Sequence, residues 1–195
     1  MIPDLASAII LAGGQSRRMQ REKSLLPVNG RTLIETIITQ INPYFDEIII
    51  STTAIDNFTF LHLPLIEDEM PGQGPLIAIM SALRVSNHGI NFVLACDIPF
   101  INIPFLQEML FLAKSYDIVV PRYCDDKFEP LFAAYNRGII PTIEKQIKNN
   151  DRKISHLFPL CRTKFVSMDG QKWFRNLNTL KEYHDYLRQS NTERP

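Results

Sequence analysis

A pair of glycines followed by cations is the stretch of this sequence best suited to chemistry. Residues 9–23 read Ile-Ile-Leu-Ala-Gly-Gly-Gln-Ser-Arg-Arg-Met-Gln-Arg-Glu-Lys. Gly13 and Gly14 directly follow a short apolar run, and because they lack Cβ atoms, backbone N–H groups there can approach a ligand closely. The cations of the same stretch are Arg17, Arg18, Arg21 and Lys23. A glycine-rich turn with converging N–H groups and positive charge predicts a polyphosphate-binding loop.

This loop matches neither of the two common glycine motifs. A Walker A loop needs a glycine directly before Lys-Ser/Thr, whereas Glu22 precedes Lys23 here, and the dinucleotide fingerprint needs three spaced glycines. The structural alternative is a tight turn with solvated arginines. The residues that follow the loop therefore have to decide between the two interpretations.

Two aspartates stand where buried strands are expected to end. Four apolar runs alternate with helical patterns, which is typical of a parallel sheet, and they span 8–11, 47–51, 63–67 and 92–95. Asp68 follows the third run and Asp97 the fourth, and the carboxyl ends of parallel strands carry the sites of open α/β sheets. A hard carboxylate such as Asp97 can hold Mg²⁺ together with water and substrate phosphates. The structural alternatives are a turn or helix-capping acid for Asp68 and an N-cap of the next helix for Asp97.

The opening motif resembles the signature of nucleotidyltransferases with a Rossmann-like fold. Leu11 to Met19, with Lys23, is most similar to the molybdenum cofactor guanylyltransferases, whose pattern runs Leu-Ala-Gly-Gly-x-Ser-x-Arg-Met-Gly-x-Asp-Lys. Three later segments resemble the same family: Ile66-Glu67-Asp68 with Gly74-Pro75-Leu76, Cys96-Asp97-Ile98-Pro99, and Asn176-Leu177-Asn178-Thr179. Two residues depart from the pattern, Gln20 for its glycine and Glu22 for its aspartate, and Glu22 keeps the charge.

The resemblance implies a Mg²⁺-dependent enzyme that transfers GMP from GTP to molybdenum-bearing molybdopterin and releases pyrophosphate. It implies nucleotide binding by Leu11, Ala12, Gly13, Gly14, Lys23, Ser51, Asp68 and Asp97. It implies catalysis by Arg18, Lys23 and Asp97, with Asp97 as metal ligand, and acceptor binding by Arg152, Lys153, Asn176 and Asn178. Asp68 would contact guanine, because a carboxylate can accept hydrogen bonds from both N1–H and the 2-amino group. No general base is expected, and the four histidines lie far from every motif.

Several alternatives stay open on the sequence alone. A cytidylyltransferase, or another small phosphate-acceptor nucleotidyltransferase of this fold, shares the loop and the Asp-x-Pro turn, although Gly13 leaves more room for a purine than the alanine of CTP-using relatives. A non-catalytic GTP-binding relative is the alternative that Gln20 raises. The basic pair Arg152-Lys153 can be a solvated turn, and the asparagines 176 and 178 can be helix caps. Other molybdenum cofactor biosynthesis proteins or molybdoenzyme chaperones are the protein partners that the resemblance implies.

The elements that must position these residues follow from periodicity. Helices are expected at 33–41 and 180–187, capped by Thr32 and Thr179, and at 75–85, 104–113 and 141–148. Later strands are expected at 118–120, 129–135, 163–167 and 173–174, with 129–135 antiparallel and outside the parallel core. The predicted fold class is α/β, a Rossmann-like nucleotidyltransferase fold with a mostly parallel central sheet, flanking helices and a small antiparallel part in the C-terminal half. We expect one domain, with the nucleotide-binding half mainly in 1–100, the acceptor-binding half in 101–188 and a tail in 189–195.

Length and composition fit one globular enzyme domain. The chain has 195 residues, 45% of them hydrophobic, and Lys+Arg 21 balance Asp+Glu 21. The zero net charge argues against a protein that coats nucleic acid. No apolar stretch reaches the roughly 18 residues of a membrane span, and the N-terminus lacks the basic region of a signal peptide. The three widely spaced cysteines fit neither a disulfide framework nor a metal site, so we expect reduced thiols in a cytoplasmic enzyme.

Overall fold

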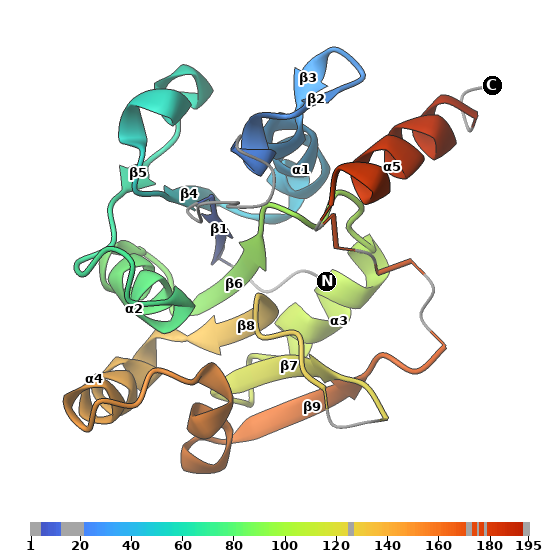
Figure 1. Cartoon of the computed structure of the whole chain (residues 1–195). Helices are drawn as coiled ribbons and strands as arrows, with labels where there is room; N and C mark the ends of the chain where they lie inside the picture. Colours follow the sequence, from blue (N-terminus) through green and yellow to red (C-terminus); the bar gives the residue numbers. More distant parts are fainter. Residues whose placement is uncertain are drawn as a thin grey trace.

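A seven-stranded sheet forms the centre of the computed structural model, which describes residues 5–12, 22–124, 127–170, 173–174, 176–177 and 179–192 (Figure 1). Its strands are β1 (Ala6–Leu11), β4 (Glu47–Ser51), β5 (Leu65–Ile66), β6 (Ile90–Ala95), β7 (Ile118–Arg122), β8 (Phe132–Asn136) and β9 (Thr163–Ser167). They lie in the order β5-β4-β1-β6-β8-β7-β9. Neighbouring strands pair parallel except at β8, which is antiparallel to both β6 and β7. The predicted fold class is confirmed.

The central strands β4, β1 and β6 end at the same edge of the sheet. Leu11 of β1 lies opposite Ser51 of β4 and Ala95 of β6. The chain winds from β1 outward to β4 and β5 and then returns past β1 to β6, so the direction of winding reverses beside β1. In open α/β sheets a crevice forms at such a reversal, outside the carboxyl ends of the strands. The topology therefore places a binding site just beyond Leu11 and Ala95.

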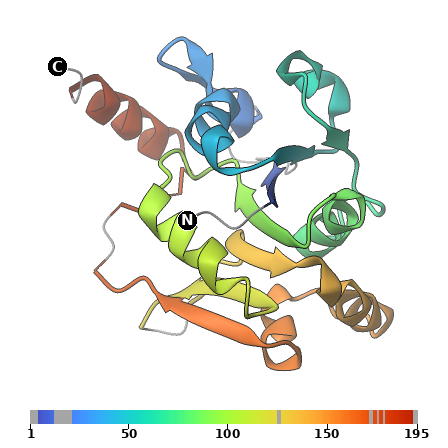
Figure 2. The same cartoon turned by 180° about the vertical axis from the view of Figure 1, so that it is seen from behind.

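Helices cover both faces of this sheet (Figures 1 and 2). The α-helices are α1 (Leu33–Ile41), α2 (Pro75–Val85), α3 (Ile103–Leu112), α4 (Ile140–Lys148) and α5 (Leu180–Thr192). The 3-10 turns are η1 (Lys23–Leu25), η2 (Asn42–Tyr44), η3 (Ile55–Leu61), η4 (Arg137–Ile139) and η5 (Ile154–Leu160). The helix α2 packs against α4 on one face, while α1 and α3 lie on the other. Within the described residues, no helix combines the length and the apolar character needed to cross a bilayer.

Local sequence signals fix α1 and the hairpin before it. The strands β2 (Pro27–Val28) and β3 (Arg31–Thr32) pair antiparallel around Asn29-Gly30, and these two residues have positive φ values of 51° and 84°, which asparagine and glycine tolerate well. Thr32 then caps α1 in a capping box with Glu35. Thr32 Oγ1 accepts a hydrogen bond from Glu35 N at 3.3 Å, and the Glu35 carboxylate accepts one from Thr32 N at 2.7 Å. The predicted cap and the predicted bounds of this helix are confirmed.

An aromatic cluster holds the late part of the chain against the sheet. Phe132 of β8 contacts Phe92 of β6, Phe105 of α3, Trp173 and Phe174, with ring centroids separated by 5.0, 6.5, 5.8 and 5.4 Å. Aromatic side chains bury more apolar surface than other residues, so such clusters dominate local packing energies. The cluster therefore places residues 173–174 beside β8, close to the end of β6.

The strand β8 is antiparallel, as expected, and it lies outside the parallel block β5-β4-β1-β6, between β6 and β7. Two other local expectations are wrong. Trp173 and Phe174 form no strand and instead supply aromatic contacts. The helix α5 continues to Thr192, so the expected tail begins as helix. Tertiary packing decided the place of Trp173 and Phe174, because aromatic contacts between distant segments leave no local signal.

Candidate active site

The phosphate loop departs from the point where three strands end. Ala12 N donates to Ser51 O at 2.8 Å, and Cys96 N donates to Leu11 O at 3.3 Å, which ties the ends of β1, β4 and β6 together. The predicted loop residues Gly13, Gly14 and Arg18 lie outside the described residues. Leu11 and Ala12 are where the sequence predicted them, at the buried base of this loop.

Lys23 begins η1 and lies within electrostatic range of Asp97. Burial raises the pKa of Asp97 above its ordinary value, and the positive charge of Lys23 opposes that shift. The residue before it is anchored from another element, since Asn57 Nδ2 in η3 donates to Glu22 Oε2 at 3.2 Å. Glu22, which stands where the family pattern has aspartate, thus keeps the negative charge, and Asn57 of η3 holds its carboxylate in place.

Asp68 follows β5, and its carboxylate is held by the end of β4. Ser51 Oγ donates to Asp68 Oδ1 at 2.9 Å. Burial raises the pKa of Asp68, while the hydrogen bond from Ser51 acts in the opposite direction. The N-cap of α2 is Gly74, with φ of 100°, so the helix-capping interpretation of Asp68 is wrong. The hydrogen bond thus brings together two residues that the resemblance assigned to the nucleotide, and it orients the carboxylate.

Asp97 follows β6 in a loop that leads to α3. Asn102 caps that helix, because its Oδ1 accepts from Phe105 N at 3.1 Å, and the N-cap interpretation of Asp97 is therefore wrong. The thiol next to Asp97 is inert: burial raises the pKa of Cys96 to about 12, so this cysteine stays protonated near neutral pH and does not act as a nucleophile.

Asn176 is brought to Asp97 by a backbone contact across the site. Leu177 N donates to Asp97 O at 2.8 Å, which seats residues 176–177 beside the Asp97 loop. The side-chain oxygen Oδ1 of Asn176 is buried and has no hydrogen-bond partner within the part of the chain that the structure describes. Buried polar atoms normally find a partner, so this oxygen is open to a ligand. Asn178 lies outside the described residues.

The oxygen donors at this edge fit Mg²⁺. Asp97 provides a carboxylate, and Asn176 provides an amide oxygen that lacks a protein partner. Mg²⁺ prefers oxygen ligands and usually keeps waters and substrate phosphates, so one or two protein oxygens suffice. Among the described residues, no group of three or more His, Cys, Asp and Glu forms a closed metal site. The arrangement matches an open site completed by a phosphorylated substrate.

Glu129 is a site residue that the sequence reasoning did not single out. Burial raises its pKa, a hydrogen bond from Tyr123 opposes the shift, and the negative charge of Asp97 raises it further. Glu129 stands just before β8, and because that strand runs antiparallel, its amino end rather than its carboxyl end meets the active edge. A search for acidic residues directly after expected strands therefore misses Glu129. The remaining signal was the Glu-Pro pair that opens the segment.

The basic pair Arg152-Lys153 is exposed and lies just after α4. Gln146 Nε2 donates to Lys153 O at 2.9 Å, and Lys153 N donates to Asp151 Oδ1 at 3.1 Å. These contacts tie the pair to the end of α4, and among the described residues no hydrogen bond or ion pair joins Arg152 or Lys153 to the edge that carries Asp97. Its predicted role in acceptor binding stays a prediction.

Histidine side chains are engaged at other places. His88 Nδ1 lies 2.8 Å from Ser7 Oγ at the amino end of β1, opposite the active edge. His156 Nδ1 lies 2.8 Å from Asp151 Oδ2 beyond α4. Neither position suits a general base for chemistry at Asp97.

An α/β sheet whose winding reverses beside β1, with a lysine and partly buried carboxylates at the carboxyl ends of its strands, fits a nucleotidyltransferase. The chain belongs to the MobA-like NTP transferase domain family, whose model matches residues 8–162. It is 32% identical to the probable molybdenum cofactor guanylyltransferase of Carboxydothermus hydrogenoformans, over 92% of this chain and 93% of that protein. The probable molybdenum cofactor guanylyltransferase of Pelotomaculum thermopropionicum is 36% identical, over 89% and 88%. The crystal structure of molybdopterin-guanine dinucleotide biosynthesis protein A from Archaeoglobus fulgidus matches with a TM-score of 0.78 over 95% of this chain and 99% of that one, at 23% identity, and supports the fold.

Proposed function

We propose that this protein transfers GMP from GTP to the phosphate of molybdenum-bearing molybdopterin and releases pyrophosphate. The observation that carries the proposal is the meeting of Lys23, Asp68, Asp97 and Asn176 at one edge of the sheet, although they are spread over most of the chain. The relatives named as molybdenum cofactor guanylyltransferases cover nearly the whole chain and support this choice of nucleotide and acceptor.

The reaction needs alignment and charge neutralisation more than proton transfer. An acceptor phosphate oxygen attacks the α-phosphorus of GTP, a new P–O bond forms, and the bond from the α-phosphorus to the bridging oxygen breaks. Pyrophosphate leaves with that electron pair. A phosphate monoester loses its second proton with a pKa of about 6, so the nucleophile is already anionic near neutral pH. The site therefore works by holding the reacting atoms in line and stabilising developing charge.

Each group of the site has a place in this scheme. The N–H group of Ala12 is engaged with Ser51 O, so the backbone N–H groups that follow it, at Gly13 and Gly14, hold the phosphates, and Arg18 and Lys23 neutralise the leaving pyrophosphate. Asp97 and the side-chain oxygen of Asn176 would hold Mg²⁺, which when bound neutralises phosphate charge. Burial raises the pKa of Asp97, and the charge of Lys23 opposes that larger effect by favouring the ionised carboxylate.

Guanine is selected by Asp68 in this proposal. Its carboxylate accepts hydrogen bonds from N1–H and from the 2-amino group, a pair of donors that cytosine, uracil and adenine do not present on one edge. The Ser51 hydrogen bond at 2.9 Å fixes the direction in which those bonds can be accepted. We assign the acceptor to the other side of Asp97, with Asn176 and Asn178 near its phosphate and Arg152 and Lys153 toward its pterin.

Nucleotide choice is tested by thermal shift of the purified protein with GTP, ATP, CTP or UTP, each with and without Mg²⁺. A ligand that binds only the native state stabilises it by about 2.7 kcal/mol at a hundredfold excess over Kd. A shift selective for GTP supports the proposal. A shift selective for CTP would replace it with a cytidylyltransferase.

Turnover is tested with GTP, Mg²⁺ and molybdenum-loaded molybdopterin by following pyrophosphate release and the mass of the dinucleotide product. Lys23→Ala and Asp97→Asn should each slow the reaction by roughly 10²–10³-fold, as for the loss of a preorganised electrostatic contact. Lys114→Ala, at an exposed lysine after α3, is the matched control and should keep wild-type turnover. GTP binding without pyrophosphate release in the presence of acceptor would refute the catalytic role and favour a non-catalytic GTP-binding protein.

A further inference from the structure

The side chain of Gln40 in α1 bridges the loop that carries Asp97. Gln40 Nε2 donates to Pro99 O at 2.9 Å, and Gln40 Oε1 accepts from Ile101 N at 3.0 Å. We propose that Gln40 is a positioning residue that holds the loop 97–101 in the geometry required for metal and phosphate binding. This inference rests on the proposed role of Asp97 as the Mg²⁺ ligand.

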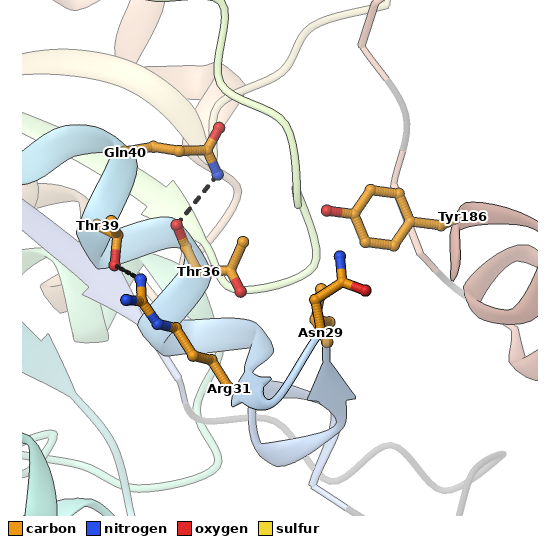
Figure 3. Close-up of a pocket in the computed structure, with 7 residues that line it drawn as sticks. Asn29, Arg31, Thr36, Thr39, Gln40 and Tyr186 are labelled. Carbon is orange, nitrogen blue, oxygen red and sulfur yellow. Dashed lines mark hydrogen bonds between the residues drawn. The ribbon is translucent and has the colours of Figure 1, made fainter. Parts of the chain in front are cut away.

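The hydrogen-bonding capacity of this amide is fully engaged. Gln40 Nε2 also donates to Thr36 O at 3.2 Å within α1, as Figure 3 shows. Both N–H groups and the carbonyl oxygen therefore have partners, and flipping the amide would set its oxygen against two carbonyl groups. The bridge consequently has one orientation, which a positioning role requires.

The loop has backbone groups that only a side chain can reach. Pro99 and Ile101 are buried, with Ile101 3% exposed, and buried backbone N–H and C=O groups are costly to leave without partners. The carboxyl end of the loop is fixed by the Asn102 cap on α3, and its start by Leu177 N on Asp97 O. Gln40 fixes the stretch between these two points. Removing the Gln40 amide leaves Pro99 O and Ile101 N, two and four residues after Asp97, without these partners.

The side chain of Gln40 also lines a cavity of about 410 Å³ between the β2–β3 hairpin, α1 and α5 (Figure 3). The other lining residues are Val28, Asn29, Arg31, Thr36, Thr39 and Tyr186. Substitution at position 40 therefore alters the wall of an existing cavity rather than a filled core. Folded variants are expected, so that loss of the bridge can be separated from loss of the fold.

Gln40→Met is the main test variant, because it keeps the length of the side chain and removes the amide. Gln40→Leu is the second variant, used if methionine lowers the melting temperature. Thr39→Val is the matched control: Thr39 lies on the same helix and lines the same cavity, and its hydroxyl bonds to Glu35 O and Arg31 rather than to the loop.

Two readouts do not depend on turnover. Trp173 is the single tryptophan of the chain, and its ring lies 6.5 Å from that of Phe100 in the bridged loop, so its emission and acrylamide quenching should change in Gln40→Met. Mn²⁺ titration in the presence of GTP, followed by electron paramagnetic resonance, should show a dissociation constant raised by about 10- to 100-fold, as for other partners that orient metal ligands. In steady-state kinetics kcat should fall while KM for GTP stays unchanged, because among the described residues neither Ser51 nor Asp68 has a hydrogen bond to residues 97–101.

The outcomes separate the bridge from the function. Changed Trp173 emission with weakened Mn²⁺ binding in both Gln40 variants, and neither effect in Thr39→Val, supports the proposal. Wild-type emission and wild-type Mn²⁺ affinity in Gln40→Met overturn it. Failure of the proposed function would appear differently, as a wild-type protein that binds no GTP and releases no pyrophosphate, and the Trp173 comparison would still decide whether Gln40 holds the loop.

Discussion

Base selection through Asp68 can be tested by removing a single ligand group. Inosine triphosphate is GTP without the 2-amino group, so it takes one hydrogen bond away from the Asp68 carboxylate and leaves the phosphates and ribose unchanged. A hydrogen bond to a charged group contributes about 1.5–3 kcal/mol. At about 1.4 kcal/mol per tenfold change in Kd, the wild-type protein should bind GTP about 10- to 100-fold more tightly than inosine triphosphate.

Two variants locate this preference in the Ser51–Asp68 pair. Asp68→Asn replaces one acceptor oxygen with an NH₂ group, so the ratio of the two dissociation constants should fall toward one. Ser51→Ala removes only the 2.9 Å hydrogen bond that orients Asp68 Oδ1 and leaves both acceptor oxygens in place. GTP affinity should therefore fall by only about 2- to 10-fold, which corresponds to about 0.5–1.5 kcal/mol. Isothermal titration calorimetry with both nucleotides provides the four constants needed for each variant cycle.

Ser81→Ala is the matched control for Ser51→Ala. Ser81 is 3% exposed and Ser51 is 2% exposed, and Ser81 Oγ accepts from Glu69 N at 3.0 Å, directly beside Asp68 in the chain. If ordering of the segment 68–69 were all that mattered, both serine variants would lose affinity equally. We expect Ser81→Ala to leave the ratio of GTP to inosine triphosphate affinity at the wild-type value.

The pH dependence of GTP affinity provides an independent check. Burial raises the pKa of Asp68, and the Ser51 hydrogen bond lowers it. Only the ionised carboxylate accepts both guanine donors, so GTP affinity should fall as the pH drops through this raised pKa. Ser51→Ala removes a donor to the ionised form and should therefore move the midpoint of the affinity–pH curve to higher pH.

One result would refute the assignment of Asp68 to guanine: an Asp68→Asn variant that still prefers GTP over inosine triphosphate as strongly as the wild-type protein.

Three further predictions concern the scaffold. Thr32→Ala removes the α1 cap and should lower the free energy of unfolding by about 1 kcal/mol, measured by urea denaturation, and an unchanged midpoint would contradict the capping box. Glu47→Gln should lower the free energy of unfolding by about 1–3 kcal/mol at pH 7. Burial raises the pKa of Glu47, but the hydrogen bonds donated by Ser7 and Asn87 outweigh that effect, so the pKa is lowered overall. This stabilisation is present above the unfolded value of 4.5 and is lost as the pH falls through the folded pKa, so a wild-type advantage that persists at pH 3 would refute this account. Phe132→Ala should cost about 3–5 kcal/mol by opening the aromatic cluster, and a loss below 1 kcal/mol would show that the cluster does not hold the late segment.

Much of the fold was readable from local patterns because short-range physics produces them. The Thr32 cap, the Asn29-Gly30 turn and the Pro75 start of α2 each follow from residues within four positions of each other. The continuous apolar runs predicted buried parallel strands, and the rule that sites lie at their carboxyl ends led to Asp68 and Asp97. The structure then removed the capping alternatives for both aspartates, since Gly74 and Asn102 cap those helices.

The sequence by itself determined which residues are able to do chemistry: the glycine loop with Lys23, and the two aspartates that follow strands. Tertiary structure decided which residues support them. Gln40 reaches the Asp97 region from a helix, and Glu129 from the segment just before an antiparallel strand. Asn176, which the resemblance had already named, is seated there by the contact of Leu177 N with Asp97 O. Sequence periodicity does not predict such contacts. The hydrogen bond from Gln40 to Pro99 joins residues 59 positions apart, so it depends on how whole elements pack and not on neighbours in the chain. A strand or helix is specified locally, whereas an active site is specified by packing.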